Sequence, residues 1–141
     1  KQTGATPDGR RAGEELTKNI TPRLGSSCSG VTALVTSALK LDPGKFMADF
    51  PVDVMLHPSA VAGKEGLIAM RALLMTYIKG GGHAIHFNVF SSKLLEDARK
   101  DPEKYQDLQV RVCGWNVLWN NLSGAEQERY LEQAKANEGI C

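Results

Sequence analysis

Two short runs of alternating residues on either side of a long helical pattern constrain the fold more than any other feature. Pro51–Leu56 and His83–Phe90 alternate in side-chain character along the chain, so each predicts a strand with one apolar face. Between them, Lys64–Lys79 predicts a helix, which the three glycines Gly80–Gly82 bring to an end. Strands and helices that interleave in this way favour the α/β class.

Four further elements are expected around this centre. Apolar spacing predicts a helix over Val31–Leu41, and Ser91 or Ser92 is placed to cap a helix that ends near Lys100. Gln109–Val112 is typical of a brief strand, and Ser123 and Glu126 have capping-box spacing before a last helix. In the central helix, we expect one apolar stripe to face the core, formed by Leu67, Met70, Leu74, Tyr77 and Ile78.

The chain is long enough for one domain with one modest core. It has 141 residues and a mass of 15.3 kDa. Residues 1–30 are rich in glycine, proline and polar residues and predict an extended arm, whereas residues 31–141 predict the folded domain. Because the chain starts at Lys1 rather than methionine, we expect it to be a piece of a longer protein.

Charge and composition exclude several classes of function. Seventeen basic against sixteen acidic residues leave a net charge of +1, which does not favour binding to nucleic acid. We expect no membrane span and no signal peptide, because no apolar run is long enough and the first thirty residues are polar. Three widely spaced cysteines make a poor disulfide framework and are typical of a reducing, cytoplasmic location.

The two histidines of His83-x-x-His86 are weak support for a metal site. Structural zinc needs four well-spaced nitrogen or sulfur ligands, and the sequence has no C-x-x-C pair. We therefore expect no bound metal, and we expect both histidines to form hydrogen bonds within the sheet. For Arg10 and Arg11 we expect salt bridges to the body of the domain or exposure to solvent.

The segment around Gly114 carries the specific signal. Val110–Asn116 reads VRVCGWN, a strand-like run, a glycine and an aromatic residue. On its own, such a glycine is most simply a tight turn or a close backbone approach.

Five blocks of the chain occur in a recognisable order and spacing. They are TPDGRRAGE at 6–14, LHPSA at 56–60, GHAIHFNV at 82–89, DPEKYQDL at 101–108 and VRVCGWN at 110–116. Taken together, they resemble the glycyl radical enzymes, the family related to pyruvate formate-lyase, over nearly the whole chain. The radical-bearing motif of that family is R-V-x-G followed by an aromatic residue, so the resemblance places the radical at Gly114.

The resemblance implies both the fold and the source of the radical. The parent fold is a ten-stranded α/β barrel, of which this chain would be the C-terminal portion, with the glycine loop reaching the barrel centre. A partner activating enzyme, using S-adenosylmethionine and an iron–sulfur cluster, would remove a hydrogen atom from Gly114. The radical is a protein-derived cofactor, and glycine suits it because a planar Cα has no side chain to crowd it.

In the family, the stored radical passes to a cysteine on a separate, upstream loop, and the thiyl radical then attacks a small-molecule substrate. None of Cys28, Cys113 and Cys141 occupies that position. We therefore expect the catalytic cysteine to lie in the remainder of the parent enzyme, so that this chain alone does not turn over substrate.

Residues beside Gly114 are expected to shield the radical, because apolar and bulky neighbours exclude water and oxygen. Where oxygen does reach it, we expect cleavage of the backbone at Gly114. The proposed shielding residues are Val112, Cys113, Trp115, Asn116 and Trp119.

The subtype is less constrained. The Cys-Gly-Trp-Asn pattern, with Trp119 and the pair Asn120 and Asn121, most resembles benzylsuccinate and alkylsuccinate synthases, which add a hydrocarbon to fumarate. Arylacetate decarboxylases, dehydratases and formate acetyltransferase-type members are alternatives. Two further alternatives are a stand-alone glycyl radical carrier and a binding module in which Gly114 is only a turn.

Overall fold

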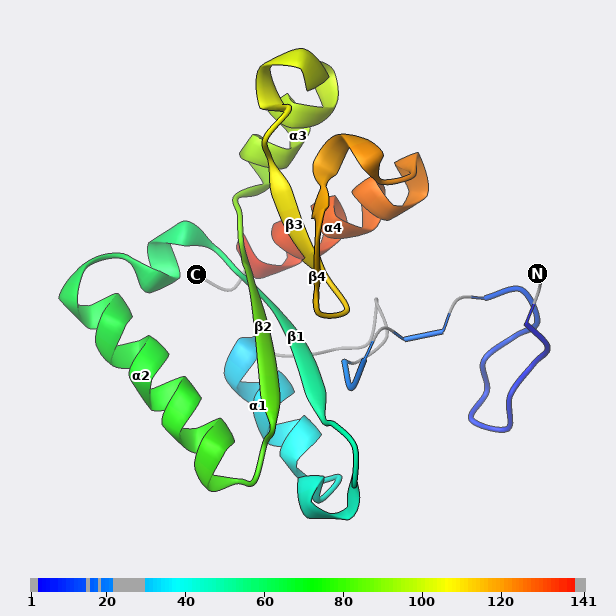
Figure 1. Cartoon of the computed structure of the whole chain (residues 1–141), viewed down its shortest axis with the longest axis vertical. Coiled ribbons are helices and arrows are strands. Elements are labelled where there is room, and N and C mark those ends of the chain that lie inside the picture. The colour runs from blue at the N-terminus through cyan, green and yellow to red at the C-terminus, as the bar shows by residue number, and fades with distance from the viewer. Residues whose placement is uncertain (1–2, 15, 18, 22–29, 139–141) are drawn as a thin grey trace.

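The computed structural model describes residues 3–14, 16–17, 19–21 and 30–138. Within these residues the chain forms two packed halves, one built on a parallel strand pair and one on an antiparallel hairpin (Figure 1). The mixture of helices and strands confirms the α/β class. The described strands form two separate two-stranded sheets.

The first half is a β–α–β unit. Strands β1 (Pro51–Leu56) and β2 (Ala84–Val89) run parallel, and helix α2 (Gly63–Lys79) connects them after the short 3-10 helix η2 (Pro58–Val61). Helix α1 (Val31–Leu39) packs beside β1 and α2, and is followed by the 3-10 helix η1 (Pro43–Lys45). The strand predicted at residues 51–56 is confirmed, and the one predicted at 83–90 is one residue shorter at each end.

Alternation along β1 and β2 assigns their side chains to two different cores. The apolar positions predicted for one face lie in the cluster shared with α1 and α2. Met55 and Phe90 point to the opposite face and belong to the second core. The same alternation puts His86 and Asn88 on that second side. The members facing α1 and α2 are Val52, Val54, Leu56, Ile85, Phe87 and Val89.

The apolar stripe predicted for α2 is partly wrong. Leu67 and Ile78 are 69% and 59% exposed, whereas Tyr77 is buried and Met70 packs against the core. The buried side of the helix passes through Gly66, where a Cβ would lie 2.3 Å from the carbonyl carbon of Val61. The spacing of apolar residues does not predict this contact, because Gly66, the position packed most closely against Val61, has no side chain.

The second half surrounds the hairpin. Helix α3 (Ser92–Lys100) begins at Ser91, whose hydroxyl accepts a hydrogen bond from the Leu94 N–H at 3.2 Å, as expected of a cap. The remaining elements are η3 (Pro102–Tyr105), β3 (Gln109–Val112), β4 (Trp115–Leu118), η4 (Trp119–Asn121) and α4 (Gly124–Glu138).

This half has its own buried core, and α4 closes it. The Ser123 hydroxyl and the Glu126 carboxylate make the reciprocal contacts of the predicted capping box. Tyr130 of α4 packs edge-on against Trp119, with ring centroids 6.4 Å apart. Strand β4 is not predicted by the sequence pattern of residues 115–118.

Arg10 differs from expectation. Its side chain is buried and its guanidinium donates to the backbone carbonyls of Gly4, Arg11 and Glu14, so it closes a loop of the arm on itself. The two terminal nitrogens of the guanidinium make these contacts, whereas its buried Nε has no hydrogen-bond partner among the described residues. Arg11 is exposed, as expected.

Candidate functional site at the β3–β4 turn

A two-residue turn places Gly114 at the tip of the hairpin. Val112 and Trp115 are paired across the strands, and the two residues between them have φ values of 48° at Cys113 and 88° at Gly114. Two consecutive positive φ values are those of a type I′ turn, which matches the twist of a hairpin. Glycine takes such a φ without strain, so the turn geometry itself calls for glycine at position 114.

Asn88 fixes the strand that leads to this turn. Its side-chain amide donates to the Arg111 carbonyl at 2.9 Å, and its carbonyl accepts from the Arg111 N–H at 2.8 Å. Asn88 is only 5% exposed, so both contacts are made largely out of water. The Tyr130 hydroxyl donates to the same Arg111 carbonyl at 3.2 Å. These contacts set the position of β3 relative to β2.

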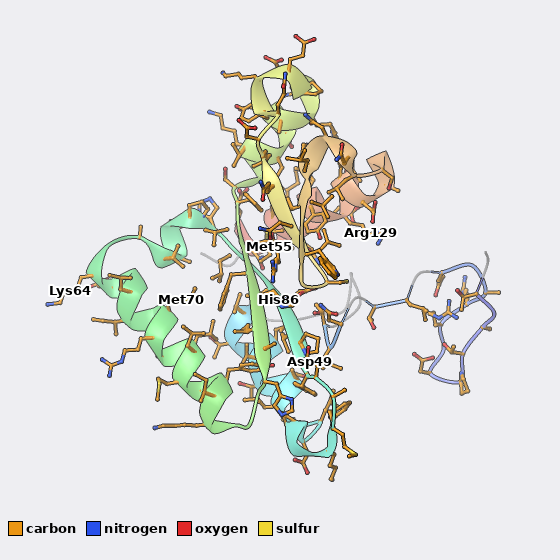
Figure 2. All side chains as sticks on the ribbon, viewed as in Figure 1. Asp49, Met55, Lys64, Met70, His86 and Arg129 are labelled. Carbon is orange, nitrogen blue, oxygen red and sulfur yellow. The ribbon has the colours of Figure 1, made fainter. Side chains whose placement is uncertain are left out.

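His86 lies against the tip of the hairpin. A Cβ placed on Gly114 would meet the imidazole of His86, 3.6 Å from Cε1 and 3.9 Å from Nε2. In Figure 2, the labelled His86 lies where the hairpin tip approaches the strand pair. On its other side the ring is 2.8 Å from Asp53, between Nδ1 and Oδ1. This contact confirms the expectation of a hydrogen bond within the sheet for His86.

Asp53 is itself held in place. The Asn19 side-chain amide donates to Oδ2 of Asp53 at 2.8 Å, and the backbone N–H of Asp53 donates to the Thr21 hydroxyl at 3.1 Å. A chain of hydrogen bonds therefore runs from the arm through Asp53 to His86, whose ring lies beside Gly114.

The phenol of Tyr130 stays protonated beside this site. Burial raises the pKa of Tyr130, and the negative charge of Asp53 raises it further. The hydroxyl therefore remains a hydrogen-bond donor to β3 at any physiological pH.

The residues predicted to shield Gly114 are dispersed. Trp115 is 75% exposed, and Cys113 and Asn116 are exposed as well. Val112 packs against the second core, and Trp119 is buried within it. Within this chain these side chains do not enclose the glycine, and their shielding role stays a prediction.

Sequence reasoning singled out His86 but did not connect it to Gly114, and it missed Asp53 and Asn88 as site residues. The usable signal was the alternation in β2, which puts His86 and Asn88 on one face. The partner strand could not be inferred, because register is a property of the tertiary pairing. In the part of the chain that the structure describes, no cluster of three or more histidine, cysteine, aspartate or glutamate side chains is arranged to hold a metal. Cys28 and Cys141 lie outside the described residues.

A comparison with protein families supplies the context for this turn. The family model described as "Glycine radical" matches residues 16–120 of the chain, a span that includes the turn. The chain belongs to the glycyl radical family. The resemblance inferred from the five sequence blocks is therefore confirmed.

Relatives of this glycyl radical domain are enzymes of several kinds. Indoleacetate decarboxylase of Tractidigestivibacter scatoligenes is 39% identical over 134 residues, which are 94% of this chain and 15% of that protein. Trans-4-hydroxy-L-proline dehydratase of Clostridioides difficile is 37% identical over 128 residues, 91% of this chain and 16% of that protein. The chain thus spans about one sixth of the length of these curated relatives.

The fold is also similar to that of a solved structure. The glycerol-bound B12-independent glycerol dehydratase from Clostridium butyricum superimposes with a TM-score of 0.82 at 38% identity. The match covers 93% of the glycyl radical domain and 17% of the dehydratase chain. In the described residues, no helix combines the length and apolar character needed to cross a membrane.

Proposed function

We propose that Gly114 stores a backbone radical for a larger, oxygen-sensitive enzyme of anaerobic metabolism. The observation that carries the proposal is the position of Gly114 in the R-V-x-G motif, at the tip of a two-residue turn with φ of 88°. No side chain of its own crowds the Cα there, so the centre is free to become planar.

The radical is formed, used and restored in three hydrogen-atom transfers. A 5′-deoxyadenosyl radical, generated from S-adenosylmethionine at the iron–sulfur cluster of a partner activating enzyme, takes one hydrogen atom from the Gly114 Cα and becomes 5′-deoxyadenosine. The Gly114 radical then takes the hydrogen atom of a cysteine S–H, which leaves a thiyl radical to react with substrate. After turnover, the thiyl radical recovers a hydrogen atom from Gly114.

The cysteine of this second step lies in the remainder of the parent enzyme, a ten-stranded barrel of which these residues form the C-terminal portion. Exposed apolar side chains support a covering by further protein. On α2, Leu67, Ile68 and Ile78 are 59–69% exposed, and Trp115 beside Gly114 is more exposed still.

For the type of reaction, the sequence pattern and the relatives favour different candidates. The Cys113-Gly114-Trp115-Asn116 pattern favours addition of a hydrocarbon to fumarate. The names of the relatives at 39% and 37% identity favour the decarboxylase and dehydratase alternatives instead. Product analysis of the activated parent enzyme with an arylacetate, a vicinal diol and toluene plus fumarate separates the three.

The deciding experiment is anaerobic electron paramagnetic resonance after incubation with the cognate activating enzyme. We expect a doublet that collapses in protein labelled with 2-deuteroglycine and is absent in Gly114→Ala. Gly81→Ala is a matched control, because Gly81 has φ of 84°, so that alanine there is strained as it is at position 114, but Gly81 lies at the end of α2. A doublet that persists in Gly114→Ala would contradict the proposal.

A further inference from the structure

His86 lies on one definite side of Gly114. In an L-amino acid, Cβ projects from Cα in the direction of the pro-S hydrogen of glycine. The described atoms within 4 Å of a Cβ built on Gly114, apart from its chain neighbours, are Cε1 and Nε2 of His86. The imidazole therefore faces the side of Gly114 from which the pro-S hydrogen projects.

The imidazole is held by a neighbour on the adjacent strand. Asp53 and His86 are directly opposite each other in the parallel register, and both side chains are largely buried, at 17% and 16% exposure. Because a carboxylate only accepts hydrogen bonds, the Asp53 contact assigns the proton to Nδ1 of His86. Nε2 and Cε1 are thereby directed at the turn.

The hairpin is attached to the strand pair chiefly through side chains. Within residues 30–138 the two sheets share no backbone ladder. Asn88 and Tyr130 hold Arg111, three residues before Gly114, and the His86 ring lies beside the Gly114 Cα on the side where a Cβ would project. Movement of the tip away from His86 therefore leaves the hydrogen bonds that anchor Arg111 in place.

We propose that His86, oriented by Asp53, is a positioning residue that seats the Gly114 turn and covers the pro-S side of its Cα. A reacting atom must come within about 3–3.5 Å of its target, and the imidazole occupies this side while the turn is seated. Removal of the pro-S hydrogen then requires the turn to leave His86. This inference rests on the proposed radical function of Gly114.

The contact itself is tested in the radical state. The full-length parent enzyme is labelled with 13C and 15N in histidine, activated anaerobically, and studied by electron–nuclear double resonance. We expect a weak dipolar coupling between the glycyl radical and a histidine ring, lost in His86→Gln and retained in the control His83→Ala. His83 is exposed and lies three residues from His86, outside the contact. A glycyl radical without this coupling would overturn the inference while leaving the proposed function standing.

The gating role is tested by the rate of radical formation. Shortening the side chain in His86→Ala should raise the initial rate of activation about three- to tenfold, while His86→Gln, which keeps a side chain over the turn, should stay nearer to the wild-type rate. Asp53→Asn should act in the same direction as His86→Ala, by loosening the ring. An unchanged or slower rate in His86→Ala would overturn the gating role. Absence of any radical in the wild-type protein would instead overturn the proposed function, and this inference with it.

Discussion

Asn88 takes the place of one rung of a β-ladder between β2 and β3. Its side-chain amide makes the same two hydrogen bonds to Arg111 that a neighbouring backbone would make, at 2.9 and 2.8 Å. One side chain thus joins the two sheets at the strand that ends in the Gly114 turn.

Replacing Asn88 should therefore destabilise the protein and loosen the hairpin. Asn88→Ala leaves the backbone N–H and C=O of Arg111 without this partner, and we expect a loss of about 2–3 kcal/mol in the free energy of unfolding. Chemical denaturation followed by circular dichroism measures it. Asn120→Ala is the control, because Asn120 is exposed and its amide donates to the carbonyl of Pro102, which is also exposed. Equal losses in both variants would contradict the bridging role.

Cys113→Asn should stabilise the turn. Cys113 has φ of 48°, a conformation that asparagine adopts more readily than cysteine, and Asn-Gly is the preferred pair for a type I′ turn. We expect a gain of about 0.5–1 kcal/mol in the free energy of unfolding, measured by the same denaturation. Cys113→Val, with a β-branched residue at the same φ, should have the opposite sign. A stabilising valine would show that φ at this position is not the cause.

Gly66→Ala tests the close approach of α2 to η2. In an exposed helix interior this change normally stabilises by about 0.5–1 kcal/mol, because glycine is the poorer helix former. Here the added Cβ would lie 2.3 Å from the Val61 carbonyl carbon, so we expect a net loss of about 1–3 kcal/mol. At Gly124, the first residue of α4, a Cβ meets nothing within 4 Å, and Gly124→Ala should be neutral or mildly stabilising. Gly66→Ala should therefore be clearly the less stable of the two variants.

Glu138 should make stability depend on pH in the acid range. Its carboxylate accepts hydrogen bonds from the backbone N–H and the hydroxyl of Ser92, each at 2.7 Å, and these contacts lower the pKa of Glu138 below its ordinary value of 4.5. Since the pKa is lower in the folded state, the stabilisation is complete above about pH 4.5 and is lost as the pH falls through the folded value.

The measurement is the unfolding free energy of wild type and Glu138→Gln between pH 3 and pH 7. Wild type should be the more stable at pH 7, and the difference should shrink as the pH falls below 4.5. Glu132→Gln, at an exposed position of the same helix, serves as the control. A difference that is independent of pH would assign the effect to the side chain's shape rather than its charge.

Exposure of the activated protein to air should cut the backbone at Gly114. The turn is at the protein surface, with Cys113 and Trp115 exposed on either side, so within this chain oxygen has access to the Cα. Intact mass spectrometry should detect a smaller fragment that begins next to Gly114 and contains residues 115–141. Gly114→Ala treated in the same way should stay whole; cleavage of that variant would place the reactive centre elsewhere.

The sequence alone was sufficient for features that depend on local chemistry. Alternation located β1 and β2 and divided their faces correctly, and Ser123 with Glu126 marked the start of α4. The stripe on α2 failed at Leu67 and Ile78, because the helix packs through Gly66, which carries no apolar side chain. Strand β4 was missed because its four residues, WNVL, are partly exposed on both faces and provide little apolar contrast.

For the candidate site, the motif located Gly114, but its surroundings depend on tertiary pairing. The positions of Asp53 and His86 opposite each other follow from the register of two strands that are 33 residues apart. Likewise, Trp115 is exposed and Trp119 is buried, and the sequence does not predict this difference because both residues have the same aromatic side chain.

The two-residue turn also has a consequence for how this segment tolerates change in length. Only the two turn residues lie between the paired residues Val112 and Trp115. The number of residues in β3 therefore fixes how far Gly114 lies from Arg111, where Asn88 holds the strand. Inserting or deleting one residue in β3 would turn each following side chain to the opposite face and carry Gly114 away from His86. We therefore expect β3 to tolerate substitutions far better than an insertion or a deletion.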